Sequence, residues 1–125
     1  MKTGYLRTRD GAHIYYEDRG EGIPILFVPG HMCTVRFFDR CAALLEREFR
    51  VIAMDPRGFG NSSKVLHGNT VERHCDDIHE LIEYLELEKT VLLGWSLGGS
   101  LVMMYAHKYG EGCLGAVGLL DCALF

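Results

Sequence analysis

Short apolar runs alternate with longer amphipathic segments along the whole chain. Residues 23–28 form a continuous apolar run between glycine-containing turns, which is typical of a strand that is buried on both faces. Two alternating segments joined by Asp10-Gly11 predict a hairpin before it. The predicted strands are 5–8, 12–17, 23–28, 50–55, 90–93 and 115–120.

Between these strands, apolar residues recur at helical spacing, and we expect helices at 36–48, 71–85 and 98–109. The second helix has the clearest apolar stripe, and its acidic residues between Glu72 and Glu88 are expected to form a solvated face. Alternating strands and helices with short connections predict an α/β domain. Its mostly parallel sheet begins with an antiparallel hairpin and has helices on both faces.

The composition is that of one globular domain. The chain has 125 residues, of which 48% are hydrophobic and 24% are charged, which is enough for a single packed core. The net charge of −4 provides no basic field, and no apolar stretch approaches the roughly 20 residues of a membrane helix. We therefore expect neither nucleic acid nor a membrane as a partner. Five cysteines without a C-x-x-C pair and an N-terminus unlike a signal peptide predict a cytoplasmic protein.

The segment Gly94-Trp95-Ser96-Leu97-Gly98 places a serine between a predicted strand and a predicted helix. In this context the G-x-S-x-G pattern holds the serine in a strained turn that lifts its hydroxyl clear of the sheet. The first N–H groups of the following helix then point to the place where an oxyanion would form. The plainer interpretation is a glycine-rich turn in which Ser96 only caps the helix.

Together with this motif, two further segments resemble the α/β-hydrolase superfamily. Residues 27–33 read Phe-Val-Pro-Gly-His-Met-Cys and look like the loop after the family's third strand, with Pro-Gly where the family usually has His-Gly. Residues 55–62 read Asp-Pro-Arg-Gly-Phe-Gly-Asn-Ser and are similar to the family's D-x-R-G-x-G-x-S turn. The opening hairpin and the order of the later elements fit the same fold.

This resemblance implies a serine hydrolase that cleaves small esters, lactones or thioesters through an acyl-serine, with no metal or cofactor. It makes Ser96 the nucleophile, and the backbone N–H groups of Leu97 and His31 the two oxyanion donors. Residues 55–62 are implied to shape their turn and not to catalyse. The implied partner is a small-molecule acyl substrate.

A base that could activate Ser96 is not evident in the sequence. The family order is Ser, then Asp or Glu, then His, and the candidates after Ser96 are His107, Glu111 and Asp121. His107 lies about 16 Å along the helix from Ser96 and is expected to be a helix-end residue. Asp121 is a weak candidate for the catalytic acid, since a structural carboxylate explains it as well. We therefore predict that residues 1–125 are the N-terminal half of an α/β-hydrolase core, without the catalytic histidine and the late strands.

An incomplete core would leave the strand at 115–120 as an uncovered apolar edge. Such an edge favours self-association or completion by a second chain. The alternative function is therefore a catalytically inactive hydrolase-like fragment, or a binding module that a partner chain completes. Met32, Phe37 and Trp95 are the candidates to line an apolar pocket.

Three other interpretations follow from the residues alone. The side chain of His31 could reach Ser96 from the mouth of the pocket. Cys75 and His79 are i,i+4 neighbours on a predicted helix, as in a metal site, although a third ligand is missing. Residues 58–63 also resemble part of a dinucleotide-binding turn, but they lack its third glycine and a helix directly after it.

Overall fold

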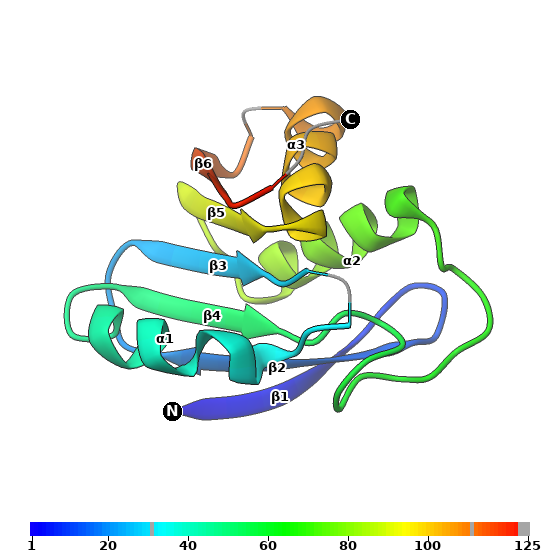
Figure 1. Ribbon diagram of the computed structural model, residues 1–125, viewed down its shortest axis with the longest axis horizontal. Coiled ribbons are helices and arrows are strands. Elements are labelled where there is room, and N and C mark those ends of the chain that lie inside the picture. The colour runs from blue at the N-terminus through cyan, green and yellow to red at the C-terminus, as the bar shows by residue number, and fades with distance from the viewer. Residues whose placement is uncertain (31, 111, 123–125) are drawn as a thin grey trace.

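The computed structural model describes residues 1–30, 32–110 and 112–122, and they form one six-stranded sheet with helices on both faces (Figure 1). The predicted α/β fold is therefore confirmed. The strands are β1 (Lys2–Arg7), β2 (His13–Arg19), β3 (Pro24–Val28), β4 (Arg50–Met54), β5 (Thr90–Trp95) and β6 (Leu114–Leu120). The helices are the 3₁₀ helix η1 (Val35–Phe38), α1 (Asp39–Leu45), α2 (Val71–Tyr84) and α3 (Leu97–Tyr109).

The strand order is β1-β2-β4-β3-β5-β6. The hairpin β1–β2 joins the sheet through an antiparallel pairing of β2 with β4, whereas β3 is parallel to both of its neighbours and β6 is parallel to β5. Parallel strands end at the same edge of a sheet, so the loops after β3, β4 and β5 meet there. In open α/β sheets this edge is where ligands bind.

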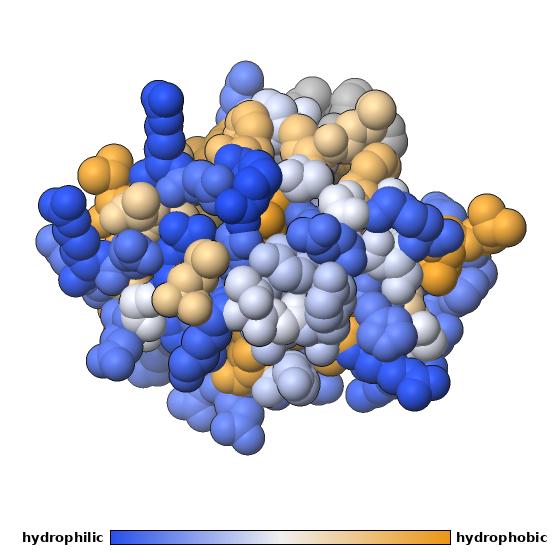
Figure 2. All heavy atoms as spheres, turned by 90° about the horizontal axis from the view of Figure 1, so that it is seen from below, coloured by the Kyte–Doolittle hydropathy of each residue, from blue (hydrophilic) through white to orange (hydrophobic). Residues whose placement is uncertain are grey.

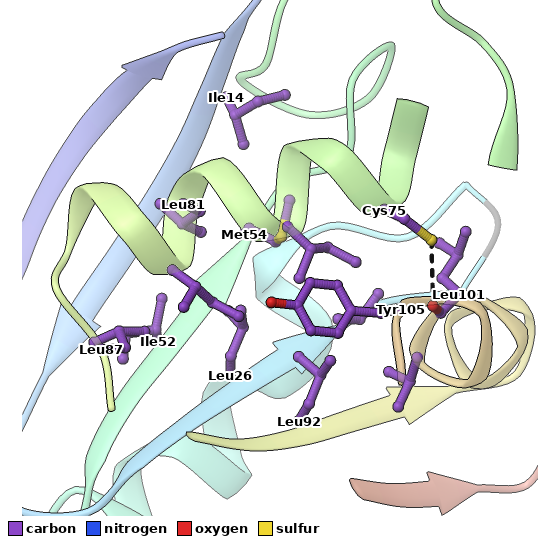
Figure 3. Close-up of a cluster of buried hydrophobic side chains, with 14 of the residues drawn as sticks. Ile14, Leu26, Ile52, Met54, Cys75, Leu81, Leu87, Leu92, Leu101 and Tyr105 are labelled. Carbon is purple, nitrogen blue, oxygen red and sulfur yellow. Dashed lines mark hydrogen bonds between the residues drawn. The ribbon is translucent and has the colours of Figure 1, made fainter. Parts of the chain in front are cut away.

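The two faces of the sheet are covered by different helices. On one face, α2 and α3 pack over a large apolar cluster that includes Leu26, Ile52 and Leu92 from the central strands (Figure 3). On the other face, η1 and α1 cover a smaller cluster in which the rings of Phe27 and Phe38 stack with centroids 4.4 Å apart. The central strands are thus buried on both sides, as their continuous apolar runs predict.

The segment predicted as one helix over 36–48 is a 3₁₀ turn followed by a helix that ends at Leu45. The Leu45 carbonyl accepts the N–H groups of both Glu48 and Phe49, at 3.0 and 2.9 Å, which tightens the chain into a turn. The chain must reverse here because the next residue, Arg50, begins β4 and donates its N–H to Ile23. The pairing of β4 within the sheet therefore ends the helix earlier than the helical spacing of the apolar residues predicts.

The two outer strands of the sheet differ in polarity. β1 begins with Lys2 and ends with Arg7, and the face of the molecule seen from its side is mostly hydrophilic (Figure 2). β6 contains no charged residue, and Val117 and Leu120 are 42% and 43% exposed. Among the described residues, no helix is both long and apolar enough to pass through a membrane.

Candidate active site

Ser96 occupies a sharp backbone corner between β5 and α3. Its φ and ψ angles are 55° and −119°, a region that side-chain-bearing residues rarely adopt and that costs about 1–3 kcal/mol. Ser96 makes no side-chain hydrogen bond to the first turn of α3. By contrast, Thr70 has extended backbone angles and accepts the Arg73 N–H at 3.1 Å, as a helix cap does. The capping interpretation of Ser96 is therefore wrong.

The glycines on either side of Ser96 allow close packing at this corner. A Cβ atom on Gly94 would lie 2.2 Å from the Gly98 carbonyl oxygen, and one on Gly98 would lie 2.2 Å from the carbonyl oxygen of Val28. The start of α3 therefore packs directly against the end of β3. A Cβ atom on Gly30 would come within 3.1 Å of the Ser96 Cβ, so the loop after β3 also lies against the serine.

The surroundings of Ser96 are suited to a developing negative charge. Ser96 is only partly buried, and Leu97, the first residue of α3, is 42% exposed. The first N–H groups of a helix have no partner within it, and its N-terminal end attracts negative charge. The role of Leu97 as an oxyanion donor stays a prediction. His31, the other predicted donor and a candidate base, lies outside the described residues.

A cavity of about 550 Å³ lies beside this corner. Its walls come from the loop after β3, the loop between β4 and α2, and the first turns of α2 and α3. Met32, Phe37 and Trp95, which were predicted to line a pocket, are not among its lining residues. The ring of Phe37 stacks instead on that of Trp95, with centroids 4.0 Å apart. The lining residues that matter most here are Gly30, Leu66, Val71, His74, Leu97 and Leu101.

The glycine-rich turn after β4 is held by its own polar groups. The buried Asp55 carboxylate accepts the backbone N–H of Val35 at 2.7 Å and that of Asn61 at 2.8 Å. The N–H groups of Gly58 and Phe59 bond to the carbonyl groups of Ser63 and Pro56. A phosphate needs such N–H groups as donors, and those of Gly58, Phe59 and Asn61 are occupied, which argues against the dinucleotide interpretation.

Arg57 has a larger structural role than its motif suggests. Its side chain is 0% exposed and forms two-pronged ion pairs with Asp77 of α2 and Asp10 of the β1–β2 turn, at 2.7–2.9 Å. The hydrogen bonds from Arg57 hold the pKa of Asp10 well below its usual range. Arg57 also donates to the His67 carbonyl, which ties the wall of the cavity to the core.

The acidic face predicted for α2 is therefore only partly solvated. Asp77 is 1% exposed and Glu80 is 9% exposed, and both pair with Arg73. The prediction of a solvated face was wrong for these two acids, because Asp77 also pairs with Arg57 and Glu80 also accepts the Arg9 N–H, and both of these partners lie on other elements. No pattern near Asp77 indicates that Arg57, twenty residues earlier, would reach it.

The residues of the suggested metal site point to different partners. The buried Cys75 thiol donates to the Leu101 carbonyl at 3.4 Å, and burial raises its pKa to about 11, which disfavours the thiolate that a metal requires (Figure 3). The ring of His79 bonds to the Tyr105 hydroxyl and to Glu83. Within residues 1–30, 32–110 and 112–122, no group of three or more His, Cys, Asp or Glu is placed to hold a metal ion.

The predicted helix-end position of His107 is confirmed, since it lies exposed in the last turn of α3. Asp121 directly follows β6, has a positive φ of 45° and is exposed. The preceding carbonyl, that of Leu120, accepts the Ser96 N–H at 3.0 Å, so the end of β6 lies next to the corner. Glu111 lies outside the described residues.

A family model described as alpha/beta hydrolase fold matches residues 23–120. The chain is 34% identical to "Non-heme chloroperoxidase CPO-A1" of Kitasatospora aureofaciens, over 91% of this chain and 42% of that protein. It is 36% identical to "Bifunctional esterase/perhydrolase DCH" of Acinetobacter calcoaceticus, over 85% of this chain and 40% of that protein. It superposes on an esterase (EaEST) from Exiguobacterium antarcticum with a TM-score of 0.92 at 32% identity, over 95% of this chain and 45% of the esterase. The chain thus spans about two-fifths of the length of these curated relatives.

Proposed function

Because the chain belongs to the alpha/beta hydrolase fold family, we propose that it carries the nucleophile of a serine hydrolase that acts on small ester, lactone or thioester substrates. The observation that carries this proposal is the corner at Ser96. Its strained backbone and its hydroxyl, which does not cap α3, are the two properties that separate a nucleophile from a structural serine. Relatives that are named as esterases support the reaction class.

In the proposed reaction, the Ser96 oxygen attacks the carbonyl carbon of the substrate. The carbonyl oxygen becomes negative and is stabilised by the N–H of Leu97, with that of His31 as the second predicted donor. A donor of this kind is commonly worth about 3 kcal/mol in the transition state. The tetrahedral intermediate then expels the alcohol or thiol and leaves an acyl group on Ser96, which water removes by the same route.

The reaction requires a base that takes the Ser96 proton and returns it to the leaving group. His107 is about 16 Å away along α3, at 1.5 Å per residue. The hydrogen bonds of His67 and His79 join them to Asp10, Tyr105 and Glu83. We infer that none of these three histidines is the base.

The test is labelling of the chain with a small alkyl fluorophosphonate, followed by peptide mass spectrometry. We expect the label on Ser96 and its loss in Ser96→Ala. Ser63→Ala is the matched control, because the Ser63 hydroxyl accepts the His13 N–H at 2.8 Å and does not line the cavity, so its loss should leave the label in place. A label on another residue, or a chain that stays unlabelled under native conditions, would overturn the proposal.

The exposed apolar side chains of β6 favour a second candidate, a binding module completed by a partner chain. Val117 and Leu120 expose apolar surface on a strand without charged residues, and natural sheets usually protect such edges. A monodisperse monomer of the chain at high concentration, measured by sedimentation, would contradict this candidate. Self-association that Val117→Lys prevents would support it.

A further inference from the structure

The charged side chains that line the cavity beside Ser96 are all positive. Its described lining residues include Arg57 and Lys64 but no aspartate or glutamate, and the remaining ionisable side chain there is that of His74. Much of the other wall is aliphatic, with Val71 and Leu97 among the lining residues. A charge in such surroundings acts more strongly than it does in open water. The sign of a ligand's charge therefore bears on how well it binds there.

Two of the three ionisable groups on the wall provide no net charge for a ligand. The Arg57 side chain is 0% exposed and lies between the carboxylates of Asp10 and Asp77, which neutralise it. Burial lowers the pKa of the His74 imidazole, with Arg57 acting in the same direction and Asp77 opposing it, so His74 is neutral at neutral pH. Lys64 is the cation that remains.

Lys64 differs from Arg57 in both its exposure and its partners. It is exposed in the loop between β4 and α2, and its ammonium group donates to the backbone carbonyl groups of Gly60 and Ser62, the second at 2.8 Å. Both acceptors are neutral, and no carboxylate in the described part of the chain pairs with Lys64. An ammonium group has three donors. The two carbonyl groups therefore hold it in place while one donor stays available to a ligand.

A single cation with one available donor is suited to a group with a single negative charge. A phosphate group carries up to two charges and is bound best by several donors or by the fork of an arginine, and the fork of Arg57 is already occupied. A carboxylate carries one charge and accepts such a bond on one oxygen. Gly30 lines the same cavity and packs against the Ser96 side chain. An ester that reacts at Ser96 can therefore place a second group in this cavity.

We propose that Lys64 is a specificity-determining residue that binds a carboxylate on a part of the substrate away from the reacting ester, so that anionic esters are the preferred substrate class. The proposal rests on the proposed function of Ser96, because it names the substrate class of that same site. An ion pair at an exposed lysine is expected to favour the anionic substrate by about fivefold over its uncharged analogue.

The first experiment compares fluorophosphonates whose alkyl chain ends in a carboxylate with the methyl esters of the same probes. Butyl, hexyl and octyl chains are used. For at least one chain length we expect the carboxylate probe to label Ser96 about fivefold faster than its methyl ester at low ionic strength. High salt should reduce this advantage by screening. Equal rates at every chain length, with Ser96 still labelled, would overturn the role of Lys64 and leave the nucleophile in place.

Variants of Lys64 test the residue itself, and its exposed side chain makes them compatible with folding. Lys64→Met should remove the advantage of the carboxylate probe, Lys64→Glu should reverse it, and Lys64→Arg should retain it. Lys2→Met is the matched control, because it removes the same charge from an exposed residue of β1 that does not line the cavity. A carboxylate preference that survives Lys64→Met would show that another residue sets it.

A binding measurement keeps the proposal testable if no probe labels Ser96. Monomethyl adipate is titrated into Ser96→Ala while the Cε resonance of Lys64, assigned by its loss in Lys64→Arg, is followed by NMR. We expect a saturable shift with monomethyl adipate, none with dimethyl adipate, and weaker binding of acetate. Absence of the first shift, or equally tight binding of acetate, would overturn the proposal. The expected shifts in a chain whose Ser96 stays unlabelled would reject only the proposed catalysis.

Discussion

Two glycine-rich turns at the same edge of the sheet use their polar residues in opposite ways. The β4 turn, residues 55–62, bonds its carboxylate, guanidinium and hydroxyl groups to other parts of the fold. The β5 corner, residues 94–99, packs its glycines against neighbouring backbone but leaves the Ser96 hydroxyl out of the capping of its helix. In sequence, both turns combine glycines with polar residues, and only the resemblance to the hydrolase family assigns catalysis to the β5 corner. The contacts of their polar groups are what separates a structural turn from a candidate active site.

The comparison is tested most strongly by removing one hydroxyl from each turn. Ser96→Ala should abolish labelling and lower any esterase rate by at least about 10³-fold. Its unfolding free energy should stay within about 0.5 kcal/mol of the original.

Ser62→Ala should do the reverse, because its buried hydroxyl accepts the Tyr15 N–H at 2.9 Å and donates to the Asp55 carbonyl at 2.7 Å. We expect a loss of about 1–3 kcal/mol in urea denaturation with Ser96 labelling retained. If both variants reduced labelling equally, the hydroxyl groups of the two turns would not differ in role.

Replacement of Arg57 is the next largest expected effect. Arg57→Met leaves the buried Asp77 without its main counter-charge and should lower the unfolding free energy by about 3–5 kcal/mol in urea denaturation. Arg50→Met is the control, because Arg50 pairs with Asp18 while its side chain is 30% exposed, and it should cost about 1 kcal/mol or less. A similar small loss for both variants would mean that Arg57 does not anchor the β4 turn.

Local patterns in the sequence were sufficient for the architecture but not for the ion pairs. The apolar run of β3 and the stripe of α2 are local signals, and the structure places both elements within two residues of their predicted bounds. The strain at Ser96 could also be foreseen, because glycines two residues away on both sides permit it. The partners of Arg57 could not, since Asp10 and Asp77 come from other elements and meet it only after the sheet forms. The cavity was missed for the same reason, because three separate segments build it.

The glycines of the β4 turn provide a comparison within one turn. Gly60 has a φ of 56°, and a Cβ atom there would lie 2.2 Å from a carboxylate oxygen of Asp55. Gly58 also has a positive φ, 89°, but a Cβ atom there would meet nothing within 4 Å. Gly58→Ala should therefore cost about 1 kcal/mol from backbone strain alone, and Gly60→Ala at least about 2 kcal/mol. Equal costs in denaturant titrations would show that the Asp55 carboxylate is free to move aside.

The pH dependence of stability tests the ion pair of Asp10 with Arg57, through which the β4 turn is anchored. Arg57 lowers the pKa of Asp10 in the folded protein, so this carboxylate contributes stability that is complete above its unfolded pKa of about 3.9. The contribution is lost as the pH falls below that value toward the folded pKa. Asp10→Asn should lower the unfolding free energy at pH 7 by about 1.5–2 kcal/mol. It should also flatten the acid limb of a stability profile measured between pH 6 and about 2.5. If the unfolding free energy of the variant falls with decreasing pH as steeply as that of the original chain, the acid dependence comes from other carboxylates.

The smallest expected effect concerns the backbone of the β5 corner. Ser96→Gly relieves the positive φ of 55°, because glycine adopts such angles without a steric penalty. The gain of about 1–3 kcal/mol from lost strain exceeds the cost of about 0.5–1 kcal/mol for the greater freedom of glycine in the unfolded chain. We therefore expect a net rise of about 1 kcal/mol in the unfolding free energy, together with loss of labelling. Ser100→Gly, the same change inside α3, should lower it by about 0.5–1 kcal/mol. If denaturation curves show a higher unfolding free energy for Ser96→Gly and a lower one for Ser100→Gly, the backbone at Ser96 is strained. If both variants lose the same unfolding free energy, the corner is relaxed and its serine is an ordinary turn residue.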